Sequence, residues 1–202
     1  MKSSLFKFSV FDIVEMGVMC ALAIALDTFV KIPIGATGGS INIALLPLMV
    51  VAYRHGWFKG FIAGGVVFGF ITCLIDGYGF QFFPFEYFLA FGSVAIAALF
   101  GVTIFKNFSK KTALNKVISI AFIILSMVIV FVIRTMCGTI DSMIFYHYNF
   151  GAAFAYNVAY VGPSCGIVAV LLILLLPVFK SINQVYPTTY LKDTLVDEES
   201  DE

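Results

Sequence analysis

Long apolar runs alternate along the chain with short breaks that are polar or rich in glycine and proline. A transmembrane α-helix needs about 20 apolar residues to cross a hydrocarbon core of ~30 Å. One run, 40–54, is short for this purpose, which predicts a tilted or irregular span. The predicted spans are 11–30, 40–54, 57–76, 84–105, 116–145 and 152–180. We therefore expect an all-α membrane protein, a six-transmembrane-helix bundle.

The lysines and arginines predict how the spans are oriented, because cytoplasmic loops carry an excess of these residues. With the amino terminus in the cytoplasm, cytoplasmic ends collect Lys2, Lys7, Arg54, Lys59, Lys106, Lys110, Lys111, Lys116, Lys180 and Lys192. Only Lys31 and Arg134 remain elsewhere. Both termini are thus predicted to be cytoplasmic, and the turns at 31–39, 76–83 and 146–151 to face outside.

Composition strengthens the membrane assignment. Hydrophobic residues make up 61% of the chain and charged residues 12%, whereas a soluble domain carries roughly 25% charged residues. We expect the chain to lie in a lipid bilayer and to bind no nucleic acid. Acidic residues concentrate at the carboxyl terminus. A segment so charged and short does not fold alone, so we divide the chain into a transmembrane domain, 1–183, and an acidic cytoplasmic tail, 184–202.

Signatures of catalysis and metal binding are absent from the sequence. It contains no Walker A, GxGxxG, HExxH or GxSxG motif. The four cysteines lie in apolar stretches without CxxC spacing, and there are two histidines. We therefore expect no enzyme activity, no metal and no cofactor. Without a nucleotide site, uphill transport by this chain requires energy from partner subunits.

Four ionisable residues are predicted to lie at membrane depth, away from the charged ends of the first three spans: Asp27, Glu86, Arg134 and Asp141. A charge at the centre of a membrane helix costs roughly 2.5–3.5 kcal/mol on insertion scales, so each needs a partner or a function. Asp27 either reaches the interface or pairs with Lys31, one turn further on. Arg134 is more simply explained by bonds to neighbouring carbonyl groups than by a ligand.

Glu86 lies in Gln81-Phe-Phe-Pro-Phe-Glu-Tyr87, at the start of the fourth span. One interpretation is a carboxylate that the helix dipole stabilises in a first turn begun by Pro84. The other is a binding carboxylate within an aromatic box, which suits a cationic heteroaromatic ligand. We favour the second interpretation.

Polar stripes mark the last two spans. In the fifth, Arg134, Gly138, Asp141 and Ser142 share one helical face, which we expect to point into protein. In the last, Asn157, Tyr160 and Ser164 form a stripe that should be hydrogen-bonded inward. The pattern alone leaves open whether this second stripe joins helices or contacts a ligand.

Five short segments are more specific together than any one is alone. They are Ala21-Leu-Ala-Ile-Ala-Leu-Asp27, Gly38-Gly-Ser-Ile-Asn-Ile-Ala-Leu-Leu-Pro47, Pro84-Phe-Glu-Tyr-Phe-Leu-Ala-Phe91, Arg134 with Ile144-Phe145, and Tyr156-Asn-Val-Ala-Tyr-Val-Gly-Pro163. In this order, over roughly residues 12–180, they resemble the thiamine-specific substrate-binding (S) components of energy-coupling factor (ECF) transporters.

The resemblance implies a six-helix protein of the bacterial plasma membrane that binds a vitamin, thiamine first, at its outer side. It implies a transmembrane coupling subunit and two cytoplasmic ATPase subunits as partners. Ala21 and Ala25, at a spacing that lets helices approach closely, would contact the coupling subunit. Glu86, Tyr87 and Asn157 would contact the ligand.

The fifth span departs from the family pattern. Aligned on Arg134, the tyrosine and histidine of the family are replaced by Thr135 and Gly138, and Tyr146 stands at the terminal aromatic position. The loss removes polar contacts that a buried site needs.

We expect Asp141 or Tyr146 to compensate, with Tyr160 completing the hydrogen bonds. A thiamine precursor or analogue, or another small vitamin, is the alternative ligand. A structural membrane subunit that transports nothing is the alternative of a different class.

Overall fold

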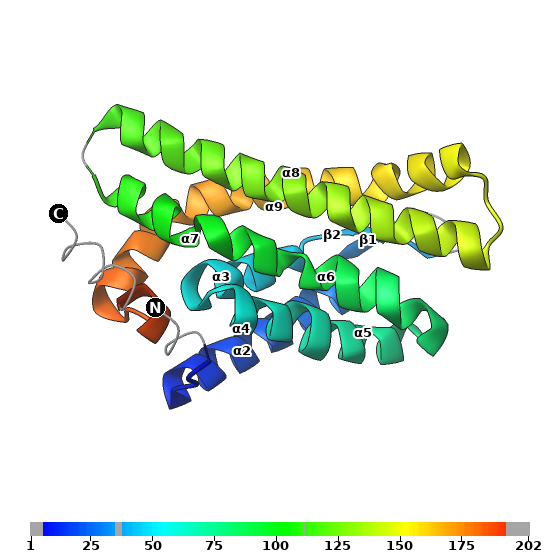
Figure 1. Cartoon of the computed structure of the whole chain (residues 1–202), viewed down its shortest axis with the longest axis horizontal. Helices are drawn as coiled ribbons and strands as arrows, with labels where there is room; N and C mark the ends of the chain where they lie inside the picture. Colours follow the sequence, from blue (N-terminus) through cyan, green and yellow to red (C-terminus); the bar gives the residue numbers. More distant parts are fainter. Residues whose placement is uncertain (1–5, 35–37, 111, 193–202) are drawn as a thin grey trace.

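The computed structural model describes residues 6–34, 38–110 and 112–192. Each of the six expected segments contains helix, and the helices pack into one elongated bundle (Figure 1). The elements are α2 (Val10–Phe29), β1 (Lys31–Pro33), β2 (Ser40–Asn42), α3 (Leu45–His55), α4 (Trp57–Phe61), η1 (Ile62–Phe68), α5 (Gly69–Asp76), η2 (Phe80–Phe82), η3 (Phe83–Leu89), α6 (Ala90–Gly92), α7 (Val94–Ser109), α8 (Ala113–Phe145) and α9 (Phe150–Val185).

A capping box starts α2. The side chain of Ser9 accepts a hydrogen bond from the backbone N–H of Asp12, and the Asp12 carboxylate accepts one from the N–H of Ser9, each at 3.1 Å. Two backbone donors of the first turn are satisfied in this way. The rings of Phe11 and Tyr186 stack at 6.4 Å, so α2 begins beside the end of α9. We call this end of the bundle the termini end.

The predicted span 40–54 is irregular, as its length suggested. Its first residues form β2, which pairs antiparallel with β1, Lys31 lying opposite Asn42. Only the 11 residues of α3 are helical, and they extend about 16 Å. The helix is therefore half as long as the hydrocarbon core is thick.

The third and fourth segments are helical from Trp57 to Asp76 and from Phe80 to Ser109. Each contains a π-helical stretch, η1 and η3, in which the helical turn is wider than in an α-helix. The fourth segment starts earlier than the expected 84 because η2 and η3 already form helical turns at 80–83.

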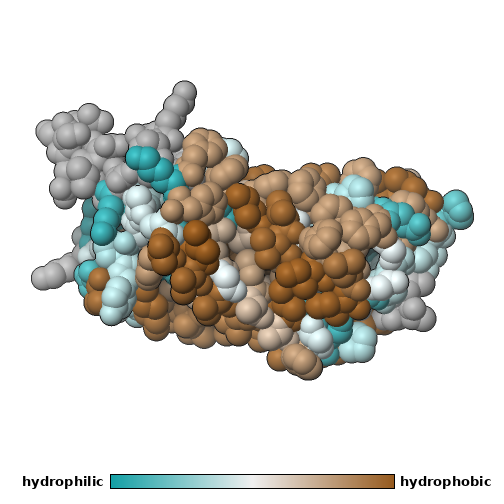
Figure 2. Space-filling view, turned by 90° about the horizontal axis from the view of Figure 1, so that it is seen from below, coloured by the Kyte–Doolittle hydropathy of each residue, from teal (hydrophilic) through white to brown (hydrophobic). Residues whose placement is uncertain are grey.

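On the face seen in Figure 2, apolar side chains form a broad belt between two more polar ends. Four helical segments are long and apolar enough to cross a membrane: Trp57–Asp76, Phe80–Ser109, Ala113–Phe145 and Phe150–Val185. In the described part of the chain, α2 falls outside this set because it carries three acidic residues, and α3 because it is short. The all-α membrane fold is thus confirmed, and the count of six spans stays a prediction.

A network of charged side chains is buried at the termini end. Lys59 Nζ lies 2.8 Å from Asp12 Oδ2, and Arg54 Nε lies 2.6 Å from Glu15 Oε1. His55 bridges both carboxylates, with Nδ1 3.2 Å from Asp12 and Nε2 3.0 Å from Glu15. Because α2 supplies both acids and α3 and α4 supply the bases, the network ties these three helices together.

Residues after α9 cover this network. The hydroxyl of Thr188 donates to the carbonyl oxygen of Arg54, and Arg54 Nη2 donates to the carbonyl oxygen of Tyr186 at 3.2 Å. Thr188 and Leu191 are buried. The first residues of the expected tail therefore pack on the bundle, while the acidic stretch 193–202 lies outside the described residues.

The chain's one tryptophan also lies at the termini end. The ring of Trp57 contacts those of Phe6 and Phe58 edge-on, with centroid distances of 6.3 and 5.8 Å. These rings surround the start of α4, beside Lys59.

Lys59→Met is expected to lower the unfolding temperature in detergent, because it removes the cation nearest a fully buried carboxylate. Breaking a buried ion pair from one side costs ~3–5 kcal/mol. Adding Asp12→Asn should recover part of the loss, and Lys110→Met, at an exposed position, should change little. Equal unfolding temperatures for the Lys59 and Lys110 variants would contradict the role assigned to the network.

Candidate substrate-binding site

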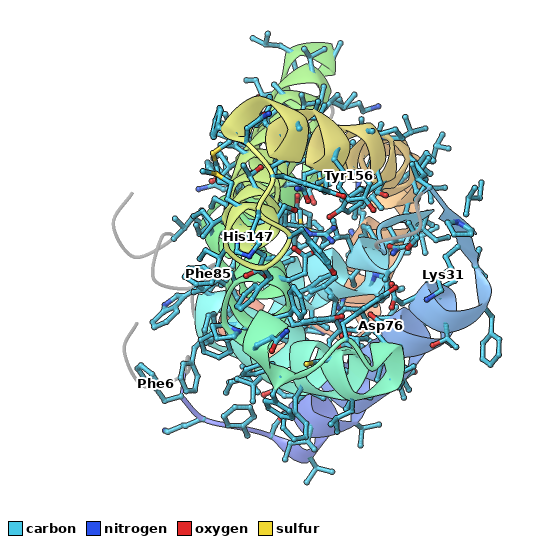
Figure 3. The ribbon with its side chains drawn as sticks, turned by 90° about the vertical axis from the view of Figure 1, so that its right-hand side faces the viewer. Phe6, Lys31, Asp76, Phe85, His147 and Tyr156 are labelled. Atoms are coloured by element: carbon cyan, nitrogen blue, oxygen red, sulfur yellow. The ribbon has the colours of Figure 1, made fainter. Side chains whose placement is uncertain are left out.

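A cavity of about 200 Å³ opens at the end of the bundle opposite the termini end. Its walls come from the last turns of α2 and α5, the β1–β2 hairpin, η3, the outer half of α8 and the first turns of α9. Figure 3 looks at this end of the bundle, with Lys31 and Asp76 on one side and Tyr156 on the other. Segments far apart in the sequence thus converge on one site.

Carboxylates outnumber basic groups around the cavity. The acidic lining residues are Asp27, Asp76, Glu86 and Asp141, and the basic ones are Lys31 and Arg134. Lys31 Nζ lies 3.6 Å from Asp76 Oδ1, so this pair largely neutralises itself. The remaining groups leave an excess of negative charge, which favours a cationic ligand.

Glu86 projects from η3 across the cavity to α8. Its Oε1 lies 3.4 Å from the hydroxyl of Tyr160, and a Cβ atom added to Gly138 would lie 2.8 Å from its Oε2. Only a residue without a side chain leaves room there. The space that a histidine would need at position 138 is therefore occupied by the Glu86 carboxylate and by the amide of Asn157.

Asp141 and Arg134 line the cavity on the same face of α8, on either side of Gly138. The Asp141 side chain is 3% exposed, and neither carboxylate oxygen has a hydrogen-bond partner among the described residues. The Arg134 guanidinium lies 4.3 Å from the centroid of the Phe91 ring, and its Nε is likewise unpaired within the described residues. A buried charge without a partner is costly, so both groups are suited to a ligand in the cavity.

Asn157 stands behind the cavity wall. Its Oδ1 accepts from the Tyr160 hydroxyl at 2.5 Å, and its Nδ2 donates to Ser142 Oγ at 3.2 Å and to the carbonyl oxygen of Ala153 at 2.9 Å. With these bonds the amide is fully buried and joins α8 to α9. It supports Tyr160 and does not line the cavity.

Aromatic side chains form the outer wall. Tyr146 and Phe82 stack at 5.6 Å with an angle of 25° between their rings. Burial, together with the phenols of Tyr78 and Tyr156, raises the pKa of the Tyr146 phenol, so this group stays neutral and presents a flat ring to the cavity. Tyr87 donates to Asp76 Oδ2 at 3.0 Å and lines the wall with its ring.

The β1–β2 hairpin is held over the cavity by Asn42. Its Nδ2 donates to Asp27 Oδ1 at 2.8 Å, and its backbone N–H donates to Ser164 Oγ at 3.2 Å. Of the two alternatives considered for Asp27, the pairing with Lys31 is wrong: the chain leaves α2 as a strand, which directs Lys31 to Asp76.

Most of the predicted site residues lie together. Glu86, Tyr87, Asp141, Tyr146 and Tyr160 all line the one cavity. The sequence analysis missed Asp76 and Asn42 as site residues and treated Arg134 as structural. Arg134 and Asn42 gave a signal in the sequence, since each is a polar residue within an apolar run. Asp76 gave none, because a charge at the end of a predicted helix is common.

Comparison with known proteins identifies the class. The fold is that of an all-α membrane protein with a charged cavity between its helices, and a solved structure described as native-SAD phasing for ThiT from Listeria monocytogenes shares it. The two chains align with a TM-score of 0.68 and 23% identity, over 84% of this chain and 94% of the other. No curated relative gives a significant match.

The family model described as thiamine transporter protein matches residues 13–185. The chain belongs to this family of thiamine transporter proteins. Its membership in a transporter family agrees with the prediction that it is not an enzyme.

Gly138→Ala is expected to lower the unfolding temperature, although glycine-to-alanine changes in a helix usually stabilise by up to ~1 kcal/mol. The added Cβ collides with Glu86 and Asn157, and such overpacking costs about 1–3 kcal/mol. Gly166→Ala is the matched control, because nothing lies within 4 Å of a Cβ there. A Gly138 variant as stable as the Gly166 variant would contradict the packing described here.

Proposed function

We propose that this chain is the substrate-binding component of an ECF-type vitamin transporter and that it captures thiamine in the cavity lined by Glu86 and Asp141. The observation that carries the proposal is the presence of two carboxylates, Glu86 and Asp141, in one cavity with aromatic rings, in a chain of the thiamine transporter family. Thiamine joins a cationic ring to an aminopyrimidine. Carboxylates complement both its charge and its amino group, and aromatic faces complement its rings.

Each lining group has a role in this proposal. Glu86 and Asp141 accept hydrogen bonds from the ligand or face its positive charge, and Tyr146 stacks on a ring. Tyr160, held by Asn157, orients Glu86 through the 3.4 Å contact. Tyr87 lines the wall and is oriented by Asp76.

The proposed topology has six spans with both termini in the cytoplasm. The lysines at 106–116, Lys180 and Lys192 then lie on the cytoplasmic side, and the cavity opens to the outside, where an uptake system meets its substrate. The short helix α3 spans together with the hairpin before it. Irregular backbone at membrane depth is tolerated where it is buried in protein or lines a cavity.

The proposed partners are those that the resemblance to ECF S components implies. We propose a transmembrane coupling subunit and two cytoplasmic ATPases, in the plasma membrane of a bacterium. On α2, Ala21 is exposed and Ala25 partly so, and nothing lies within 4 Å of a Cβ placed at Gly17. This surface of small side chains is the proposed contact for a helix of the coupling subunit.

A thiamine precursor is the second candidate ligand. It is favoured by Gly138, which stands where the family has a histidine: the Glu86 carboxylate and the Asn157 amide occupy the space that a side chain would need. Titration with thiamine, then with its pyrimidine and thiazole halves, followed by tyrosine fluorescence, decides between the two. No response to any of them, or to other small vitamins, would favour a structural subunit.

Glu86→Gln and Asp141→Asn are each expected to weaken thiamine binding about ten- to a hundredfold, because a charge-assisted hydrogen bond contributes ~1.5–3 kcal/mol. Tyr148→Phe, outside the cavity lining, should leave the Kd unchanged. Titration calorimetry of the purified protein measures all three. Wild-type affinity in both carboxylate variants would contradict the proposed binding site.

The topology is tested by labelling introduced cysteines with a membrane-impermeant maleimide in right-side-out vesicles. The four native cysteines are buried and free, which keeps the background low. Tyr148→Cys should react at once, and Lys110→Cys only after the vesicles are opened. The reverse order would mean the opposite orientation. Immediate reaction of both cysteines would place both sites outside, which requires an even number of crossings between them and contradicts a single span formed by α8.

A further inference from the structure

The two helical segments that precede and contain Glu86 touch through their backbones. A Cβ added to Gly65 would lie 2.7 Å from the carbonyl oxygen of Phe88, and one added to Gly69 would lie 2.9 Å from that of Tyr87. Gly64 approaches the same helix one turn away, 2.5 Å from a carbonyl oxygen. No side chain fits between these segments, and the atoms in the way belong to backbone, which has no rotamer to change.

The contact joins two π-helical stretches. Gly65 belongs to η1, Gly69 is the first residue of α5, and the carbonyl groups that they approach belong to η3. Such closeness allows Cα–H···O contacts between the helices. π-helical turns occur mostly at functional sites, and η3 is the element that carries Glu86 and Tyr87.

On its other side, η3 faces α8. The Glu86 carboxylate reaches within 2.8 Å of where a Cβ at Gly138 would stand. The turn of η3 at residues 86–88 is therefore held between glycines of two neighbouring segments. Gly65 and Gly69 contact its backbone from one side, and Gly138 contacts the Glu86 side chain from the other. If η3 moves away from Gly69, Glu86 moves into α8.

We propose that Gly65 and Gly69 are positioning residues, which set the depth at which Glu86 and Tyr87 stand in the cavity. The inference rests on the proposed function, because the readout is the affinity for the ligand that Glu86 binds. The glycines touch no ligand; they act through the backbone of Tyr87 and Phe88. A side chain at either position displaces η3 toward α8 and takes Glu86 out of its binding position.

The test is a double-mutant cycle on thiamine affinity, measured by calorimetry. Gly69→Ala is expected to weaken binding at least tenfold, and Gly65→Ala by more, because its collision is closer. In a Glu86→Gln background, Gly69→Ala should weaken thiamine binding by less than about twofold, since the Glu86 carboxylate that it would displace is already replaced. Gly162→Ala is the control, because the nearest atom to a Cβ there is an ordinary contact 3.7 Å away.

The outcomes separate this inference from the proposed function. A wild-type protein that binds no thiamine defeats the proposed function first. If wild type binds and Glu86→Gln weakens binding, then unchanged affinity in Gly69→Ala overturns the positioning role alone. An equal loss of affinity from Gly69→Ala in the wild-type and Glu86→Gln proteins also overturns it. Failure of both glycine variants to fold, judged by thermal unfolding, also overturns it, because the crossing would then be a requirement of the fold.

Discussion

A charge surrounded by hydrocarbon is stable only beside a partner, and this constraint divides the ionisable side chains of the bundle into two groups. At the termini end, Asp12 and Glu15 form ion pairs with basic side chains of α3 and α4, and these pairs hold the three helices together. At the opposite end, the two carboxylate oxygens of Asp141 and the Nε of Arg134 are left without hydrogen-bond partners in the described part of the chain, next to a cavity. The first arrangement is complete without a ligand, whereas the second gains its missing partners when one binds.

Glycine allows the second arrangement to exist. The site depends on three helices lying closer than side chains permit, with η3 held between Gly69 and Gly138. Nothing in the chemistry of a glycine suggests ligand binding, yet the proposed positions of Glu86 and Tyr87 depend on places where side chains are missing. Binding geometry is thus set by backbone packing as much as by the polar groups themselves.

The sequence predicted most of the helices well because the apolar runs, apart from the short one at 40–54, are long and clearly interrupted. It predicted much of the site, since polar residues such as Glu86 and Tyr160 stand out within spans. It failed where a residue's partner depends on the path of the chain. Lys31 was assigned to Asp27 by helical spacing, but the helix ends between them and the strand that follows reaches another acid.

Two other features were beyond sequence reasoning for physical reasons. Asp76 ends a helix, where a charge is unremarkable, and it becomes part of the site only because α5 returns to the hairpin. Asn157 carries the right chemistry but stands behind Tyr160, and only the packing of α9 on α8 distinguishes a supporting amide from a lining one.

The place of Trp57 gives the protein two separate optical reporters. The single tryptophan lies among phenylalanines at the termini end, while tyrosines line the cavity at the other. Light absorbed only by indole therefore reports on the face turned toward the proposed energy-supplying partners. A change in tyrosine emission when ligand is added reports on the cavity, which five of the nine tyrosines line. Events at the two ends of one small bundle can be timed against each other without attaching a dye.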